Sequence, residues 1–337
     1  MRLRSLIPDV SADVVKQLEA CGVRTDSELL FEPLFELYQR LPLKSITLQE
    51  LSRVYTVVTE LSAAEPILAS DLLKYEAEKH PLEQDAELRV GDERIDELLR
   101  GLGGARLVEI SGDRKMGKST LAFNIAINHL LSRVNESVAW VDTLGSFAPS
   151  TVLGIIFALG RKEDTLSVMR RLHVSLAFDA ETLHAVLDEL FDSDSGARPR
   201  ILVIDAITPL LTGIMSPFSS HGHAILADLM QRLRSIAGQY HTTILIINDA
   251  TVVNPLNVED AKRERKPALG PTFTFMTDTT LWLSPPKAGE EGEDVDAAQT
   301  ECDYLTIIKS RNKTAGISRA YCIYQGLFMH PESVPPG

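Results

Sequence analysis

The first part of the chain has hydrophobic positions at helical spacing. Apolar residues follow Ser11, a candidate helix N-cap, and the same pattern recurs over Asp26–Leu37 and Thr47–Leu61. The last of these segments has a Glu three residues after its opening Thr, which is the spacing of a capping box. The pattern predicts a small helical domain over residues 1–61. A linker rich in Ala, Glu and Lys is expected over residues 62–87.

From Arg106 onward, short runs of β-branched and apolar residues alternate with helical patterns. Such alternation is typical of a parallel sheet that helices cover on both faces. The predicted strands are Arg106–Ser111, Ser137–Asp142, Leu172–Ala177, Arg200–Asp205 and Thr242–Asn248. The predicted helices between them are Lys118–Val134, Ser150–Gly160, Ala180–Phe191 and Gly222–Tyr240.

After Pro271 the strand patterns follow one another without helical patterns between them. They cover Phe273–Leu283, Tyr304–Ser310 and Ser318–Gln325, and we expect them to form antiparallel hairpins that extend the sheet. The predicted fold class is therefore α/β: a mainly parallel sheet with C-terminal antiparallel hairpins, in a core domain over residues 88–337.

Charge and cysteine usage narrow the function classes. The 337 residues include 34 Lys and Arg against 47 Asp and Glu, a formal net charge of −13, which excludes a globally basic nucleic-acid binder but allows a local basic patch. The 3 cysteines have no CxxC spacing, so neither a disulfide framework nor a zinc site is expected. Arg161 ends the longest apolar stretch, and Pro8 breaks the apolar segment at the N-terminus. We therefore expect a soluble, intracellular protein without a membrane partner.

The clearest chemical signal is the segment GDRKMGKS, which matches the pattern GxxxxGK[ST] directly after an apolar strand and before an amphipathic helix. Glycines let the backbone amides wrap around phosphates, the lysine reaches the β and γ phosphates, and the hydroxyl can bind Mg²⁺. The predicted nucleotide-binding residues are Gly112, Asp113, Arg114, Lys115, Met116, Gly117, Lys118 and Ser119.

A second element is the apolar run ILVID, which ends in Asp205. An Asp at the carboxyl end of a parallel strand lies beside the phosphate loop, where it can hold Mg²⁺ through water. Ser119 and Asp205 are therefore the predicted Mg²⁺ ligands. By itself a buried strand that ends in Asp is a weak signal, and the phosphate loop upstream gives it weight.

The order of elements, the small helical domain, and the strings AWVDTLGSF and KPALGPTF resemble the RecA-type recombinases. Among these the chain is most similar to the eukaryotic recombinase paralogues, above all those of the D type. The resemblance covers most of the chain and implies a RecA-like P-loop core that binds ATP and Mg²⁺. It implies a nuclear protein that supports the main recombinase in homologous-recombination repair. The implied partners are other recombinase paralogues, the main recombinase and single-stranded DNA, in a hetero-oligomer.

The chain departs from the active members of that family at two positions. Active members carry a Glu two residues after the Asp that corresponds to Asp142, and here this position is Leu144. An alkyl side chain can neither orient nor deprotonate water. Active members also carry Asn-Gln where this chain has Asn248-Asp249, and a carboxylate there repels the nucleotide phosphates. We therefore expect weak or absent DNA-dependent ATP hydrolysis, with no catalytic residue assigned.

In this family two loops contact DNA, and they correspond to Thr212–His221 and Ala250–Pro271. The second loop holds 4 cations, which makes them the predicted DNA-binding residues: Lys262, Arg263, Arg265 and Lys266. A solvated turn that balances neighbouring carboxylates is an equally good interpretation of this cluster.

Three later cations, Lys309, Arg311 and Lys313, occupy a position from which family members reach a neighbouring subunit's nucleotide. Ordinary surface basicity is the simpler interpretation of these residues.

Two other functions stay open at this point. A DNA-dependent motor ATPase of helicase type uses the same core, but it needs a base where Leu144 stands. A scaffold with a relic phosphate loop would not require an intact Lys118, Ser119 and Asp205.

Overall fold

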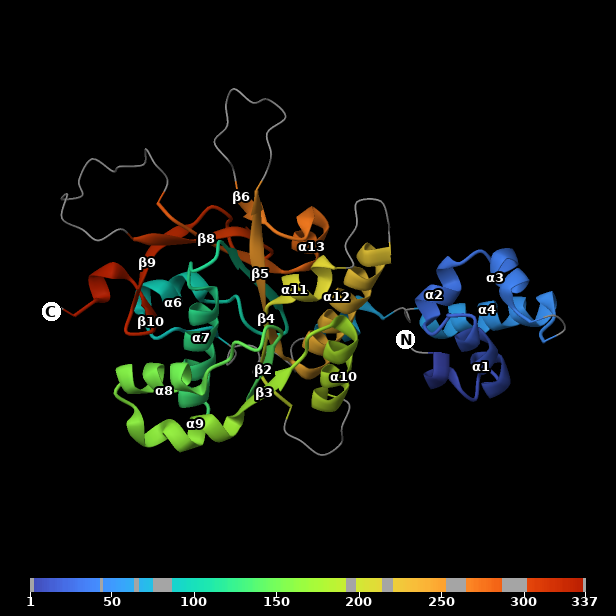
Figure 1. Ribbon diagram of the computed structural model, residues 1–337, viewed down its shortest axis with the longest axis horizontal. Coiled ribbons are helices and arrows are strands. Elements are labelled where there is room, and N and C mark those ends of the chain that lie inside the picture. Colours follow the sequence, from blue (N-terminus) through green and yellow to red (C-terminus); the bar gives the residue numbers. More distant parts are fainter. Residues whose placement is uncertain are drawn as a thin grey trace, which may run out of the picture. The chain divides into compact units, whose positions relative to one another are not determined.

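The computed structural model describes residues 3–42, 45–63, 67–74, 87–191, 198–213, 221–252, 265–286 and 302–335. The chain divides into two compact units, Met1–Glu76 and Ala77–Gly337, and each is described by itself (Figure 1). A search of the described residues for a helix both long and apolar enough to span a membrane finds none.

The first unit consists of short helices around a core of leucines and valines. Its elements are η1 (Leu3–Leu6), α1 (Ala12–Ala20), α2 (Asp26–Phe31), α3 (Leu34–Arg40) and α4 (Leu48–Ser62). The capping box at the start of α4 is present, because the Thr47 hydroxyl accepts from the backbone N–H of Glu50 at 3.2 Å while the Glu50 carboxylate accepts from the N–H of Thr47 at 2.8 Å. The single helix expected over Asp26–Leu37 is wrong. Pro33 interrupts it, because proline lacks an N–H and disfavours helical backbone at the preceding residue.

The second unit is built on one large sheet, with strands in the order β10-β9-β8-β7-β1-β5-β4-β2-β3 and β6 paired to β5. The strands from β7 to β3 are parallel, and those from β7 to β10 are antiparallel. The bounds are β1 (Leu107–Gly112), β2 (Val138–Asp142), β3 (Leu172–Leu176), β4 (Ile201–Asp205), β5 (Thr243–Val252), β6 (Arg265–Pro267), β7 (Thr279–Ser284), β8 (Asp303–Ser310), β9 (Ser318–Tyr324) and β10 (Leu327–Met329).

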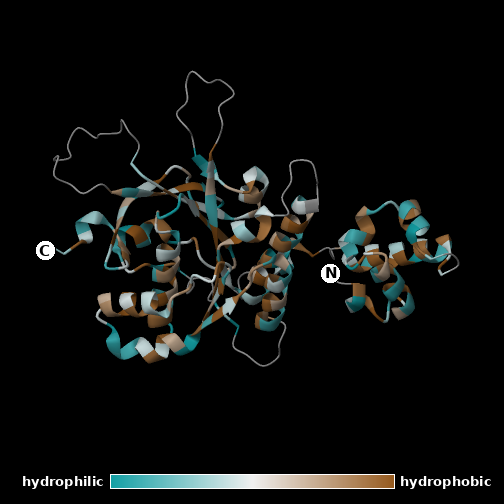
Figure 2. Ribbon diagram, in the orientation of Figure 1, coloured by the Kyte–Doolittle hydropathy of each residue, from teal (hydrophilic) through white to brown (hydrophobic). Residues whose placement is uncertain are grey.

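Helices cover both faces of the central strands, as the continuous apolar runs predict. The helical elements are α6 (Glu93–Leu99), α7 (Lys118–Ser132), α8 (Pro149–Ala158), η2 (Lys162–Asp164), α9 (Thr165–Arg171), α10 (Ala180–Phe191), α11 (Ile207–Thr212), α12 (His221–Tyr240), α13 (Gly270–Met276) and η4 (Pro331–Ser333). One hydrophobic cluster lies under α6 to α9 and a second under α10 to α12. Figure 2 shows the hydrophobic residues along β2, β4 and α8.

The predicted α/β class, the parallel sheet and its antiparallel extension are confirmed, with one correction. The expected strand Phe273–Leu283 is in fact helix α13 followed by β7, and β7 runs parallel to β1. Pro271 favours the first turn of a helix, because its fixed φ suits that position and its missing N–H is not needed there. A parallel neighbour also requires a crossover connection, and α13 supplies it.

Candidate functional site

The phosphate loop joins β1 to α7, and its two outer glycines are needed for different reasons. A Cβ on Gly112 would lie 2.5 Å from the carbonyl oxygen of Leu283 in the adjacent strand. Gly117 has φ +82°, and a Cβ there would lie 2.5 Å from Cδ1 of Ile323. At Gly112 a side chain would clash with backbone, and at Gly117 the left-handed φ disfavours any residue with a Cβ, so the loop follows this path best with glycine at both ends.

A hairpin from the far end of the chain supports the phosphate loop. The Tyr321 hydroxyl in β9 donates to the carbonyl oxygen of Met116 at 2.6 Å, and its ring stacks on Phe328 with centroids 4.3 Å apart. Asn124 of α7 donates to the carbonyl of Gly326 at 2.9 Å. Burial raises the pKa of Tyr321, so its hydroxyl stays protonated and remains a donor.

The buried ammonium group of Lys118 lies at the centre of the site. Its Nζ donates to the carbonyl oxygens of Gly112 at 2.7 Å and Asp113 at 3.0 Å, and it lies 3.2 Å from Oδ1 of Asp249. Asp249 comes from β5, which is paired with β1, so the sheet register brings this carboxylate to the loop. The residue that departs from the family pattern is therefore in direct contact with the phosphate-loop lysine.

Two further carboxylates end the neighbouring strands in register, Asp142 on β2 and Asp205 on β4. Asp142 accepts from the backbone N–H groups of Leu144 at 3.0 Å and Phe147 at 2.7 Å. Asp205 accepts a hydrogen bond from the Ser119 hydroxyl. Burial raises the pKa of Asp205 to about 6, and the charges of Asp142 and Asp249 add to that effect.

The predicted Mg²⁺ ligands therefore lie together. The Ser119 hydroxyl and the Asp205 carboxylate offer the hard oxygen atoms that Mg²⁺ prefers. A divalent cation would also offset the like charge that Asp205 meets here, so the residues present fit this ion.

Leu144 lies at the same edge of the sheet. The backbone before it is fixed, because the Thr143 hydroxyl donates to the carbonyl of Ala206 at 2.7 Å and accepts from the N–H of that residue at 2.8 Å. The Leu144 side chain is 59% exposed, so it forms no part of the core. The position is therefore built to present a side chain to solvent at the site, and that side chain has no acid–base chemistry.

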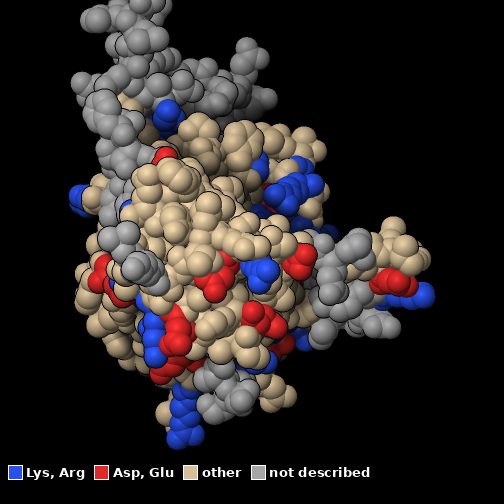
Figure 3. All heavy atoms as spheres, turned by 90° about the vertical axis from the view of Figure 1, so that its right-hand side faces the viewer, with Lys and Arg blue, Asp and Glu red and all other residues tan. Residues whose placement is uncertain are grey.

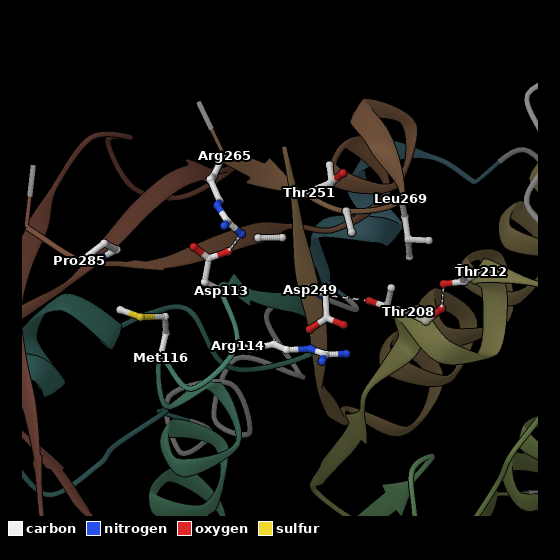
Figure 4. Close-up of a pocket in the computed structure, with 12 residues that line it drawn as sticks. Asp113, Arg114, Met116, Thr208, Thr212, Asp249, Thr251, Arg265, Leu269 and Pro285 are labelled. Atoms are coloured by element: carbon white, nitrogen blue, oxygen red, sulfur yellow. Dashed lines mark hydrogen bonds and ion pairs between the residues drawn. The ribbon is translucent and has the colours of Figure 1, made fainter. Parts of the chain in front are cut away.

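Asn248 connects the site to elements on both sides of it. Its Oδ1 accepts from the Thr208 hydroxyl at 2.7 Å, and its Nδ2 donates to Glu109 at 2.8 Å and to the carbonyl of Ala268 at 3.0 Å. The same Thr208 oxygen accepts from the N–H of Asp249 at 3.0 Å (Figure 4). These bonds fix the end of β5 against α11 and against the segment that leads into α13.

Glu109 is a buried carboxylate in β1 that sequence reasoning missed. It accepts from the hydroxyl of Ser111 at 2.6 Å, from Asn248, and from the hydroxyl of Thr280 at 2.9 Å. Burial raises the pKa of Glu109, while these bonds and the nearby Lys309 favour the ionised form. In the sequence, this carboxylate is indicated by one acidic residue inside an otherwise apolar strand.

The structure describes two of the four predicted DNA-binding residues. Lys262 and Arg263 lie outside the described residues, as do residues 214–220 of the first predicted loop. Arg265 and Lys266 lie on β6, which pairs antiparallel with the end of β5. Arg265 forms an ion pair with Asp113 of the phosphate loop, and Lys266 is exposed (Figure 4). One of the four cations therefore contacts the nucleotide site itself.

A pocket of about 910 Å³ opens between the phosphate loop and the β5–β6 ribbon. In Figure 4 the side chain of Asp113 points toward Arg265, and that of Arg114 extends toward Asp249. Its lining residues are Asp113, Arg114, Met116, Thr208, Thr212, Asp249, Ala250, Thr251, Arg265, Ala268, Leu269 and Pro285. The pocket therefore joins the predicted nucleotide site to the predicted DNA-contacting ribbon.

The late cations have partners within the second unit. The Lys309 ammonium donates to carbonyls of Thr274 and Thr277 at the end of α13, and Lys313 donates to those of Glu97 and Leu98 at the end of α6. Both lysines thus satisfy helix C-terminal carbonyls, and burial lowers their pKa values. Arg311 pairs with Asp278, which also accepts from Arg234.

The parallel strand order, the phosphate loop on β1 and the Asp at the end of β4 define a RecA-like nucleotide-binding protein. The Rad51 family model matches residues 83–294, and the chain belongs to this family. The prediction of a RecA-type recombinase paralogue is therefore confirmed.

Two known proteins illustrate the similarity. The chain is 26% identical over 286 residues to the DNA repair protein RAD51 homolog 4 of Bos taurus, covering 82% of this chain and 83% of that protein. The crystal structure of the RadB recombinase superposes with a TM-score of 0.55 at 21% identity, covering 72% of this chain and 99% of that chain. The second similarity concerns the fold.

Replacing Lys118 with Ala should weaken Mg·ATP binding tenfold or more, because it removes the cation from a site otherwise made of backbone amides. The measurement is a titration of the purified chain with a fluorescent ATP analogue in Mg²⁺. Lys162→Ala is the matched control, since it removes an exposed cation outside the phosphate loop. Equal losses in the two variants would mean that overall charge, and not the position of Lys118, governs binding.

Glu109→Gln should change how stability depends on pH. Burial raises the folded-state pKa of Glu109 above its ordinary 4.5, so the wild type loses stability as pH rises from about 4.5 through the folded-state pKa. The variant cannot ionise at this position. Over this pH range its free energy of unfolding should therefore rise relative to that of the wild type, by about 1.4 kcal/mol for each unit by which the pKa is raised.

The check is urea unfolding across a pH series, followed by the fluorescence of the 2 tryptophans, Trp140 and Trp282, which both lie in the second unit. Glu181→Gln on the exposed surface of α10 serves as the control. Parallel pH curves for wild type and Glu109→Gln would contradict the prediction.

Proposed function

We propose that this protein is an ATP-binding recombinase paralogue that supports homologous-recombination repair in the nucleus. It would act as one subunit of a hetero-oligomer of paralogues that assists recombinase filaments on single-stranded DNA, with ATP and Mg²⁺ as cofactors. One observation carries the proposal: Lys118, Ser119 and Asp205 converge on an intact phosphate loop, while the position of the catalytic Glu holds Leu144. The description of the bovine relative as a DNA repair protein supports the repair role.

The geometry favours binding over turnover. Positioning and electrostatic stabilisation account for most of phosphoryl transfer, and Lys118, Ser119 and Asp205 can supply much of both. Leu144 offers no group to orient the attacking water. Asp249 adds a negative charge 3.2 Å from the lysine that would balance the transferred phosphoryl group. ATP would therefore serve mainly as a ligand that stabilises the subunit and its contacts with other paralogues.

Contact with DNA would be confined to one small basic cluster on an otherwise acidic chain. On the face shown in Figure 3, the basic and acidic side chains of the described residues are interspersed. Arg265 of β6 lines the pocket, Lys266 follows it in the same strand, and Lys262 and Arg263 precede them in the sequence. Such a cluster on a chain of net charge −13 supports a modest, salt-sensitive interaction with single-stranded DNA.

Turnover should be about 10²–10⁴-fold below that of an active recombinase, with or without single-stranded DNA, because the general base is missing. Leu144→Glu should raise it in part, and the addition of Asp249→Gln should raise it further by removing the repelling charge. The steady-state rate of phosphate release measures the turnover of the wild type and of each variant. Leu144→Gln is the matched control, since an amide has the same shape but cannot accept the proton.

The competing function, a DNA-dependent motor ATPase, predicts the opposite result. Robust DNA-stimulated hydrolysis by the wild-type chain, abolished by Lys118→Ala, would overturn the proposal and favour the motor. Equal activity of Leu144→Glu and Leu144→Gln would show that position 144 does not receive the proton.

Neutralising the ribbon while sparing the ion pair to Asp113 should weaken DNA binding. The triple variant Lys262→Ala, Arg263→Ala and Lys266→Ala should lower single-strand affinity and flatten the slope of log K against log salt by about 2, since each lost phosphate contact removes about 0.7. Fluorescence anisotropy with a labelled oligonucleotide at several salt concentrations gives both quantities.

Two further variants separate the effect of losing positive charge from the effect of losing it at this place. A matched triple variant at the exposed Arg161, Lys162 and Arg170, between α8 and the end of α9, removes the same charge elsewhere. Arg265→Ala breaks the ion pair to Asp113 and should affect Mg·ATP binding as well as DNA binding. An unchanged salt slope in the ribbon variant would place the DNA contact on another surface.

A further inference from the structure

Two cysteines that are distant in the sequence lie at one end of the antiparallel pair β8 and β9: Cys302 directly precedes β8, and Cys322 lies within β9. The ladder pairs Tyr304 with Ala320 and Asp303 with Tyr321. The next step outward along both strands is Cys302 and Cys322. Both side chains are partly exposed thiols. No CxxC spacing marks this pair in the sequence, because strand pairing brings the two residues together.

The Cα separation expected for residues opposite one another in such a ladder lies within the range of a disulfide bond. Residues directly opposite in an antiparallel pair have Cα atoms about 4.5–5.5 Å apart. A disulfide spans Cα separations of about 4.4–6.8 Å. Their proximity also affects their ionisation, because burial and the neighbouring Cys302 raise the pKa of the Cys322 thiol.

We propose that Cys302 and Cys322 form a dithiol site that small-molecule disulfides, such as oxidised glutathione, convert to a cross-strand disulfide. The thiolate of one cysteine attacks a sulfur of oxidised glutathione, which forms a mixed disulfide and releases one glutathione thiolate. The thiolate of the other cysteine then attacks the protein sulfur of that mixed disulfide and expels the second glutathione. The two protein thiols lose two protons and two electrons, and one oxidised glutathione becomes two thiols.

The site lies beside a support of the phosphate loop. Cys322 follows Tyr321, whose hydroxyl bonds Met116, and precedes Ile323, which lies against Gly117. On its other side Cys322 pairs with Met329 of β10. A bridge to Cys302 would therefore fix the central strand of this hairpin sheet at the point where it holds the loop. The chemistry itself does not depend on nucleotide binding, so it stands apart from the proposed function.

The experiment places the full chain in buffers of graded ratio of oxidised to reduced glutathione, followed by alkylation of remaining thiols and peptide mass spectrometry. We expect one peptide pair linked through Cys302 and Cys322, while Cys21 in the first unit is alkylated as a thiol. The bridge closes a loop of the unfolded chain, so oxidation should raise the Tm of the second unit by about 5 °C or more, and dithiothreitol should reverse it.

Cys302→Ser and Cys322→Ser test the pairing separately, so that a folding defect in one does not end the test. Each variant should keep a glutathione mixed disulfide on its remaining cysteine and should lose the rise in Tm. The proposal is overturned if wild type carries only mixed disulfides, if either cysteine pairs instead with Cys21, or if oxidation leaves the wild-type Tm unchanged.

Discussion

The buried ammonium group of Lys118 is the charge on which the rest of this site depends. A cation removed from water is costly unless oxygen atoms surround it. Two carbonyls of its own loop and the carboxylate of Asp249 meet that requirement here. Asp249 reaches the lysine because β1 and β5 are parallel neighbours in the sheet, with Gly112 paired to Asp249. The strand order of the sheet therefore supplies the charged partner of this ammonium group.

The same electrostatic balance determines what the site can bind. Asp142 and Asp205 end β2 and β4, Asp249 lies where β5 stops pairing with β1, and the raised pKa of Asp205, about 6, reflects its burial near the other two carboxylates. A nucleotide without a metal would bring further negative charge to this edge. Under the proposed function, a complex with Mg²⁺ would bring a counter-ion to Ser119 and Asp205, so the site would favour the metal complex over free nucleotide. Replacing the usual Gln of this family with Asp249 strengthens that preference.

The fold was largely predictable because its signals are local. Each buried parallel strand is a continuous apolar run, and the phosphate-loop residues are consecutive in the sequence. The segment around Phe273 was misassigned because alternating Thr and Phe residues resemble a strand, and only the crossover between β5 and β7 reveals a helix. The remaining errors have the same origin. Glu109, Tyr321 and the partner of Arg265 are defined by contacts between residues far apart in the chain, which periodicity does not detect.

These contacts between residues far apart in the sequence link the phosphate loop to the β5–β6 ribbon. Arg265 of the ribbon pairs with Asp113 of the loop, and Asn248 bonds the carbonyl of Ala268 just beyond the ribbon. A nucleotide phosphate that approaches Lys118 must alter its contact with Asp249, the residue after Asn248. Asp249 and the residues that pair with β6 are consecutive in β5, so its backbone would carry such a change to the ribbon. Under the proposed function, a subunit that hydrolyses ATP poorly would still be able to use ATP binding to set the position of its proposed DNA-contacting residues, because such coupling requires binding energy and not turnover.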